Sequence, residues 1–224
     1  MRTMARFLVV FDWNGTLLDD LKPVFGSVLE IFRRYDVALP TLEEYRAEIT
    51  ANFMQFYWAH GIPRSATGEE INKIRGEVLQ AIDPKRVPLV RGTREVLQAL
   101  TQAGLKLAIV SAGTEVVQTQ LAQLGVANFF DLVTINVRDK EAALKKTLAH
   151  FSLESGGDGA TYIDDTYDGL AAAKKVGLWT CGVTWGYADK EQIALAEPHF
   201  IAEHPGELTD AIQAAWSGSL KSAD

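Results

Sequence analysis

A set of acidic, amide, hydroxyl and lysine side chains follows apolar runs that are typical of buried strands. Its members, in chain order, are Asp12, Asn14, Ser111, Lys140, Asp164 and Asp165. Clustered carboxylates repel one another unless a cation lies among them, and hard oxygen donors without Cys or His favour Mg²⁺. Such a cation would screen an incoming phosphate and allow a carboxylate to approach phosphorus. These residue types therefore indicate phosphoryl transfer.

Three of these residues have distinct predicted roles in that chemistry. Asp12 is the predicted nucleophile, which forms an aspartyl-phosphate that water then hydrolyses. Ser111 donates to a phosphate oxygen, and the backbone N–H groups of Ala112 and Gly113, at the start of a predicted helix, assist it. Lys140 supplies positive charge to the equatorial oxygens of the transition state. The prediction for Lys140 rests on its place just beyond the predicted strand that ends at Asn136, whereas Lys145 and Lys146 lie in the middle of the following helix.

Apolar runs and helical periodicity alternate along most of the chain. This pattern predicts an α/β fold with a parallel sheet covered by helices on both faces. Ligands of such sheets bind beyond the carboxyl ends of the strands, where the candidate residues stand. Gly104, Gly125 and Gly177 are expected to end helices in the left-handed conformation. The predicted strands cover residues 7–11, 106–110, 132–136, 162–163, 179–185 and 199–202.

Helical sequence separates the first predicted strand from the others. Apolar spacing becomes helical over 17–35, and Asp19 and Asp20 are interpreted as charges at the amino terminus of this helix. Two capping boxes, Thr41 with Glu44 and Thr67 with Glu70, predict two further helix starts. The predicted organisation is therefore one core formed by residues 1–17 and 88–224, with an all-helical insert at 18–87. An aromatic cluster is expected to pack mainly inside this insert; it consists of Phe53, Phe56, Tyr57 and Trp58.

Composition limits the classes of protein that the chain could be. Of its 224 residues, 47% are hydrophobic and 23% are charged, which is the balance of a soluble globular protein with a sizeable core. The net charge of -7 opposes capture of nucleic acid. The single cysteine, Cys181, excludes an internal disulfide and fits a reducing cytoplasm. No apolar run approaches the about 20 residues that span a bilayer. We expect a cytoplasmic protein without nucleic-acid or membrane partners, and the oligomeric state is not predicted.

The candidate residues also carry a resemblance to the haloacid dehalogenase-like hydrolases. Four segments resemble the four motifs of that family in the same order: Asp12-Trp-Asn-Gly-Thr-Leu-Leu-Asp19, Ile109-Val-Ser-Ala-Gly113, Lys140 and Tyr162-Ile-Asp-Asp-Thr166. The resemblance covers nearly the whole chain, and segments 183–187 and 197–201 are similar to the phosphoglycolate phosphatase-like branch. It implies a Rossmann-like three-layer catalytic core with an inserted helical cap domain. It also implies a Mg²⁺-dependent phosphatase that acts on a small phosphorylated metabolite.

Asn14 departs from the pattern of the family's phosphatases. They place a second Asp there, which protonates the leaving-group oxygen, later activates water and binds the metal through its backbone carbonyl. Asn14 still offers the carbonyl, so the resemblance implies a metal site formed by Asp12, Asn14, Asp164 and Asp165. The Asn14 amide cannot exchange a proton near neutral pH, and such help is worth about 10²–10⁴-fold in rate.

Two alternatives to a phosphatase stay open from the sequence. A binding or regulatory protein could keep the phosphate pocket with little turnover, which Asn14 would explain. Phosphonoacetaldehyde hydrolases, which cleave a carbon–phosphorus bond through an imine, also lack the second Asp, and Trp13 with segment 178–183 resembles them. Those enzymes need a lysine in the cap, and region 50–60 contains none.

Overall fold

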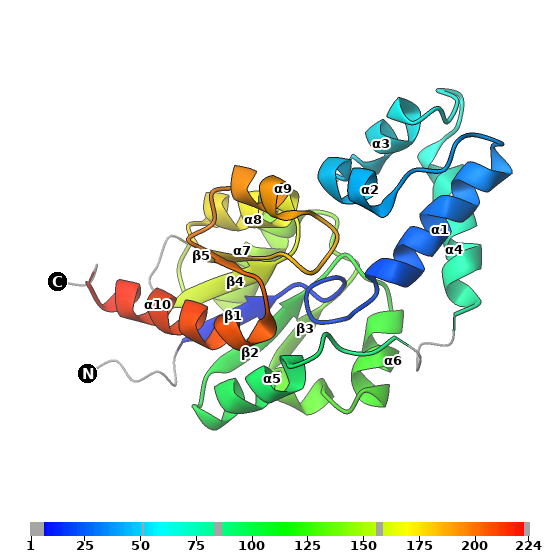
Figure 1. Ribbon diagram of the computed structural model, residues 1–224. Coiled ribbons are helices and arrows are strands. Elements are labelled where there is room, and N and C mark those ends of the chain that lie inside the picture. Colours follow the sequence, from blue (N-terminus) through cyan, green and yellow to red (C-terminus); the bar gives the residue numbers. More distant parts are fainter. Residues whose placement is uncertain (1–6, 51, 83–86, 156–158, 222–224) are drawn as a thin grey trace.

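A parallel sheet forms the centre of the protein. The computed structural model describes residues 7–50, 52–82, 87–155 and 159–221, and within them the sheet has six strands in the order β3-β2-β1-β4-β5-β6. Every neighbouring pair is parallel, which confirms the predicted α/β class (Figure 1). The strands are β1 Leu8–Phe11, β2 Lys106–Val110, β3 Leu132–Thr134, β4 Ala160–Asp164, β5 Trp179–Val183 and β6 Phe200–Ala202.

Helices cover both faces of this sheet because alternate residues of its strands point in opposite directions. In β1, Val9 and Phe11 belong to a hydrophobic cluster with Leu97 of α5 and other apolar side chains. Leu8 and Val10 belong to a second cluster on the opposite face, which α7 and α8 complete. This gives the three layers of a Rossmann-like core. The helices of the core are α5 Thr93–Gln102, α6 Val116–Gln123, α7 Lys140–His150, α8 Tyr167–Val176, α9 Lys190–Leu195 and α10 Leu208–Lys221.

The strand order explains why the candidate residues meet. The chain adds strands on one side of β1 through β2 and β3, and then returns to the other side through β4, β5 and β6. The point between β1 and β4 is therefore where the strand order reverses, and ligands of doubly wound sheets bind there. Asp12 follows β1 directly, and its backbone N–H donates to the carbonyl of Ile163 in β4. Asp164 ends β4, so it lies beside Asp12.

Four helices lie between β1 and α5 in the described residues. They are α1 Leu21–Arg34, α2 Leu42–Glu48, α3 Phe53–Ala59 and α4 Gly68–Gln80. Both predicted capping boxes are confirmed, at the starts of α2 and α4. Sequence periodicity did not predict α3, which carries the aromatic cluster. Phe56 and Tyr57 are buried with Phe32 of α1 in a hydrophobic cluster of this insert, as expected, whereas Phe53 and Trp58 are only partly buried.

The first helix begins at Leu21 and not at Leu17 as the apolar spacing predicted. Residues 12–20 form a loop in which the N–H groups of Leu17 and Leu18 both donate to the carbonyl of Trp13. Leu17 and Leu18 are fully buried in the main core beneath the sheet edge. Leu17 and Leu18 are therefore apolar because the loop is buried. In the sequence, their spacing resembled an extension of the apolar face of α1.

The insert is tied to the core through Arg46 of α2. Its guanidinium donates to the backbone carbonyls of Thr184, Gly186 and Ala188 at 2.6, 3.1 and 3.0 Å. The N–H of Asp189 donates to the Arg46 carbonyl at 3.1 Å. These contacts place the insert beside the carboxyl edge of the sheet. None of the helices that the structure describes has the length and apolar content needed to cross a membrane.

Candidate active site at the carboxyl edge of the sheet

A cavity of about 770 Å³ lies at the carboxyl edge of the sheet, between the core and the insert. Most of the predicted site residues line it, namely Asp12, Asn14, Ser111, Ala112, Lys140 and Asp164. Asp165 is completely buried and is not among the residues that line the cavity. The loop residue Gly113 is only partly buried, and it does not line the cavity either. The structure therefore brings the predicted residues into one region but gives them different access to a ligand.

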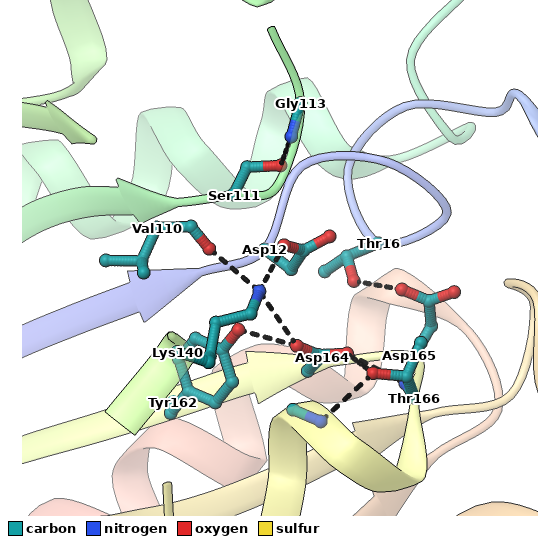
Figure 2. A network of polar contacts seen from close by, with 11 residues as sticks. Asp12, Thr16, Val110, Ser111, Gly113, Lys140, Tyr162, Asp164, Asp165 and Thr166 are labelled. Carbon is teal, nitrogen blue, oxygen red and sulfur yellow. Dashed lines mark hydrogen bonds and ion pairs between the residues drawn. The ribbon is translucent and has the colours of Figure 1, made fainter. Parts of the chain in front are cut away.

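Lys140 is the centre of the polar network (Figure 2). Its Nζ donates to Asp12 Oδ1 at 2.6 Å and to the Val110 carbonyl at 3.0 Å, and it lies 3.4 Å from Asp164 Oδ2. Burial alone would lower the pKa of Lys140, but the carboxylates of Asp12 and Asp164 raise it above its ordinary value. The amine therefore stays charged beside Asp12. By contrast, Lys145 pairs with Glu141 on the surface of α7.

The site holds more carboxylates than Lys140 can neutralise. Burial raises the pKa of Asp12 to about 6, with Lys140 lowering it and Asp164 raising it further. Burial, together with Asp164 and Asp12, raises the pKa of Asp165 well above its usual range. Buried carboxylate oxygens in excess of the nearby positive charge are suitable ligands for a hard divalent cation.

Two hydrogen bonds hold the carboxylate of Asp165. Thr16 Oγ1 donates to its Oδ1 at 2.7 Å, and the backbone N–H of Tyr187 donates to its Oδ2 at 2.7 Å. A Cβ at Gly15 would lie 2.3 Å from Asp165 Oδ2, and a Cβ at Gly186 would lie 2.1 Å from it, so both positions need glycine. Among the described residues, no three Asp, Glu, His or Cys side chains are grouped closely enough to hold a metal ion. The donor chemistry of a cation site is present, but a closed ligand set is not formed by these side-chain positions.

Asp164 is held by its own strand and the following turn. Tyr162 Oη donates to Asp164 Oδ2 at 2.5 Å, and both the N–H and the hydroxyl of Thr166 donate to Asp164 Oδ1, at 2.8 and 2.6 Å. Sequence reasoning had not given Tyr162 or Thr166 a role. Thr166 is also the N-cap of α8, where its hydroxyl accepts from the N–H of Gly169. The sequence signal that could have identified Thr166 is a threonine directly before a predicted helix, which is a common N-cap.

Asn14 is joined to a carboxylate that sequence reasoning had assigned to the start of a helix. The Asn14 Nδ2 donates to Asp20 Oδ2 at 2.6 Å, and the N–H of Gly15 donates to Asp20 Oδ1 at 2.8 Å. Tyr187 Oη also donates to Asp20 Oδ2, at 2.8 Å. Asp20 is buried and its side chain makes no cap hydrogen bond to α1, whereas Asp19 is exposed. Asp20 therefore orients the Asn14 amide and the Tyr187 phenol, both of which line the cavity.

Ser111 lies where β2 ends, and it is fully buried. The N–H of Gly113 donates to Ser111 Oγ at 3.1 Å, so this N–H orients the hydroxyl. The helix expected directly after Ser111 begins only at Val116, because residues 111–115 form a loop first. A Cβ at Gly113 would lie 2.5 Å from Val117 Cγ2 and 2.9 Å from Asn14 Oδ1, which explains the glycine.

The insert contributes a second wall of the cavity. Its members are Tyr45, Ile49, Thr50, Phe53 and Arg75. Among the described residues of the insert, no lysine lines the cavity, and Lys85 lies outside the described residues. Arg75 had no distinguishing signal, because a charged residue within a helix is usually solvated.

These features define an α/β protein with a polar ligand site at the point where the order of a doubly wound sheet reverses. The model of the haloacid dehalogenase-like hydrolases matches residues 9–183, and the chain belongs to that family. This confirms the resemblance on which the motif assignments rest.

Individual relatives match over nearly their full length. The chain is 27% identical over 221 residues to a phosphoglycolate phosphatase of Vibrio cholerae, a match that covers 92% of this chain and 96% of that protein. It is 23% identical over 215 residues to a phosphoglycolate phosphatase of Synechococcus elongatus, covering 91% and 96%. A haloacid dehalogenase-like hydrolase from Streptococcus pneumoniae has the same fold, with a TM-score of 0.72, 19% identity and coverage of 93% and 99%.

Proposed function

We propose that this hydrolase is a Mg²⁺-dependent phosphatase of a small phosphorylated metabolite similar to phosphoglycolate. One observation carries the proposal: Asp12, a carboxylate in the wall of the cavity, lies 2.6 Å from the Lys140 ammonium, and Ser111 lines the same cavity. A nucleophile, a cation and a hydroxyl donor are thus available to one phosphate group. The phosphoglycolate phosphatases among the relatives support a phosphate ester as the substrate.

In this proposal, a carboxylate oxygen of Asp12 forms a bond to phosphorus as the bond from phosphorus to the leaving oxygen breaks. Lys140 keeps Asp12 oriented and balances charge on the equatorial phosphate oxygens, while Ser111 donates a hydrogen bond to one of them. Water later cleaves the aspartyl-phosphate and releases inorganic phosphate. The leaving oxygen takes its proton from water, because the Asn14 amide carries no acidic proton. We therefore expect this protein to turn over more slowly than phosphatases of the family that have an Asp at this position.

The metal would be held by Asp12, the backbone carbonyl of Asn14, Asp164 and Asp165. When bound, Mg²⁺ supplies positive charge that offsets the negative charge of the phosphate and its transition state. The surplus of buried carboxylates described above supports this assignment.

Removal of divalent ions is expected to lower phosphate release by more than about 100-fold, because the metal contributes several kcal/mol of charge stabilisation. The measurement is inorganic phosphate released from a panel of small phosphate esters, phosphoglycolate included, before and after exhaustive treatment with EDTA. Added Mg²⁺ should restore the rate, and EDTA that is already saturated with Mg²⁺ serves as the control. Full turnover after chelation would contradict the metal assignment. No release from any ester with Mg²⁺ present would contradict the phosphatase itself.

A further inference from the structure

The insert side of the cavity carries one charged side chain among the described residues that line it. This residue is Arg75 in the middle of α4, and the other members of that wall are aromatic, aliphatic or hydroxylic. The proposed phosphate site, with Ser111 and Lys140, belongs to the core side of the same cavity. A ligand that fills the space between the two walls therefore meets Lys140 at the core side and Arg75 at the insert side.

Arg75 lacks the oxygen acceptors that bind Arg34 and Arg46 of the insert. Its guanidinium carbon lies 5.9 Å from the centre of the Phe53 ring, and its Nε is buried without a hydrogen-bond partner. No ion pair of the described residues includes it. In contrast, Arg34 pairs with Glu30 and Glu77, and Arg46 donates to backbone carbonyls. A buried donor without an acceptor costs free energy, so an acceptor that the folded chain does not supply would stabilise this position.

The chemistry of the two walls differs in a way that selects a ligand. On the core side, Arg138 and Lys175 also line the cavity, but Asp139, Glu141 and Asp168 line it too. The wall formed by the insert contains no acid among the described residues. A guanidinium next to aromatic and aliphatic groups binds planar or tetrahedral oxyanions strongly, because its paired N–H groups match two oxygen atoms of the anion.

We propose that Arg75 binds a second acidic group of the substrate, at the end opposite the phosphate that is cleaved. The substrate class is then a phosphate monoester that carries a further carboxylate or phosphate, and esters with a neutral tail are poor substrates. This inference rests on the proposed phosphatase function. Arg75 determines which substrates bind, whereas Asp12, Ser111 and Lys140 take part in the reaction at phosphorus.

The test compares two esters of similar length with the wild type and Arg75→Gln in the presence of Mg²⁺. Phosphoglycolate has a carboxylate at its tail, and ethyl phosphate has a methyl group there. We expect Arg75→Gln to lower kcat/KM for phosphoglycolate by about 10- to 100-fold, mainly through KM, since a charge-assisted hydrogen bond is lost. The kcat/KM for ethyl phosphate should not change. Ethylene glycol bisphosphate, with a phosphate tail, then shows whether Arg75 prefers a carboxylate or a second phosphate.

Lys73→Gln is the matched control, because it removes one positive charge from an exposed position of the same helix. It should leave the kinetics of both esters as in the wild type, and Arg75→Lys should retain part of the preference for phosphoglycolate. Thermal unfolding of each variant verifies that it is folded. Equal losses on both esters with Arg75→Gln would mean that Arg75 is structural, and no loss on phosphoglycolate would equally overturn the assignment.

A binding measurement separates this inference from the proposed function. Phosphonoacetate and ethylphosphonate resemble the two esters but lack the bond that is cleaved, so their affinities are measured by calorimetry without turnover. Tighter binding of phosphonoacetate that Arg75→Gln abolishes supports Arg75, even if neither ester is hydrolysed and the phosphatase proposal fails. Equal or undetectable binding of the two phosphonates by the wild type overturns the role of Arg75, even if both esters are hydrolysed.

Discussion

Asp12→Asn is expected to lower phosphate release by about 10⁴-fold or more, because an amide cannot take the place of the attacking carboxylate. The amide oxygen can still accept the hydrogen bond from Lys140 that Asp12 Oδ1 accepts at 2.6 Å. The fold and the binding of phosphate should therefore survive while the reaction is lost. The rate of phosphate release at saturating substrate and Mg²⁺ measures the effect.

The control for Asp12→Asn is Glu141→Gln. Glu141 also lines the cavity, but its carboxylate pairs with Lys145 on the surface of α7. This change removes the same negative charge from the same cavity and should leave turnover close to that of the wild type. Wild-type turnover by Asp12→Asn, or equal losses in both variants, would show that Asp12 is not the nucleophile.

The double variant Asn14→Asp with Asp20→Asn is expected to raise turnover by about 10²–10⁴-fold, because it introduces a general acid and base at position 14. The single change Asn14→Asp should gain much less. Asn14 Nδ2 donates to Asp20 Oδ2 at 2.6 Å, so a carboxylate at position 14 would face a second buried carboxylate. Two carboxylates at this separation cannot both ionise without a large cost. The exchange in the double variant keeps one amide and one acid in contact.

Asp20→Asn alone is the control, because it removes the carboxylate without adding an acid at position 14, and we expect no gain from it. All four proteins are compared by kcat on the same ester. A gain by Asn14→Asp equal to that of the double variant would show that Asp20 does not oppose the new acid. No gain in either would show that another group already serves the leaving oxygen. A peptide map of each protein verifies that Asn14, which precedes glycine, has not deamidated.

The wild-type rate also separates an enzyme from the binding alternative that Asn14 left open. A chain that binds phosphonoacetate, hydrolyses nothing and gains hydrolysis in the double variant would be a phosphate-pocket protein that has lost its acid. A chain that hydrolyses phosphoglycolate slowly and gains from the double variant fits the proposed function.

Much of the framework could be read from local patterns. The strand 106–110 was predicted with its observed bounds, and the glycines at 104, 125 and 177 have the expected positive φ angles. These features are local, because a buried parallel strand is a short apolar run and a helix stop needs a residue that tolerates the left-handed region. Asp12, Ser111 and Asp164 were found for the same reason, since they stand directly at strand ends.

Three features of the site had no local signal. Asp20 was interpreted as a helix-start charge, but it is buried against Asn14 and Tyr187, and Tyr187 lies far away in sequence. The hydrogen bonds of Asp165 to Thr16 and to the N–H of Tyr187 join segments that lie far apart in sequence. Arg75 resembled a solvated helix residue, but it lines the cavity.

The physical reason is the same in each case. The place of a residue on a strand or helix can be predicted from its neighbours in sequence, because the spacing of apolar residues reflects which positions are buried. The direction of a polar side chain depends on which donors and acceptors the packing of distant segments places beside it. For this chain the order of residues is enough to locate the catalytic edge of the sheet. The contacts of Asp20 and Asp165 with Tyr187, and the place of Arg75 in the wall of the cavity, arise only when the insert and the loop at 184–189 pack against that edge.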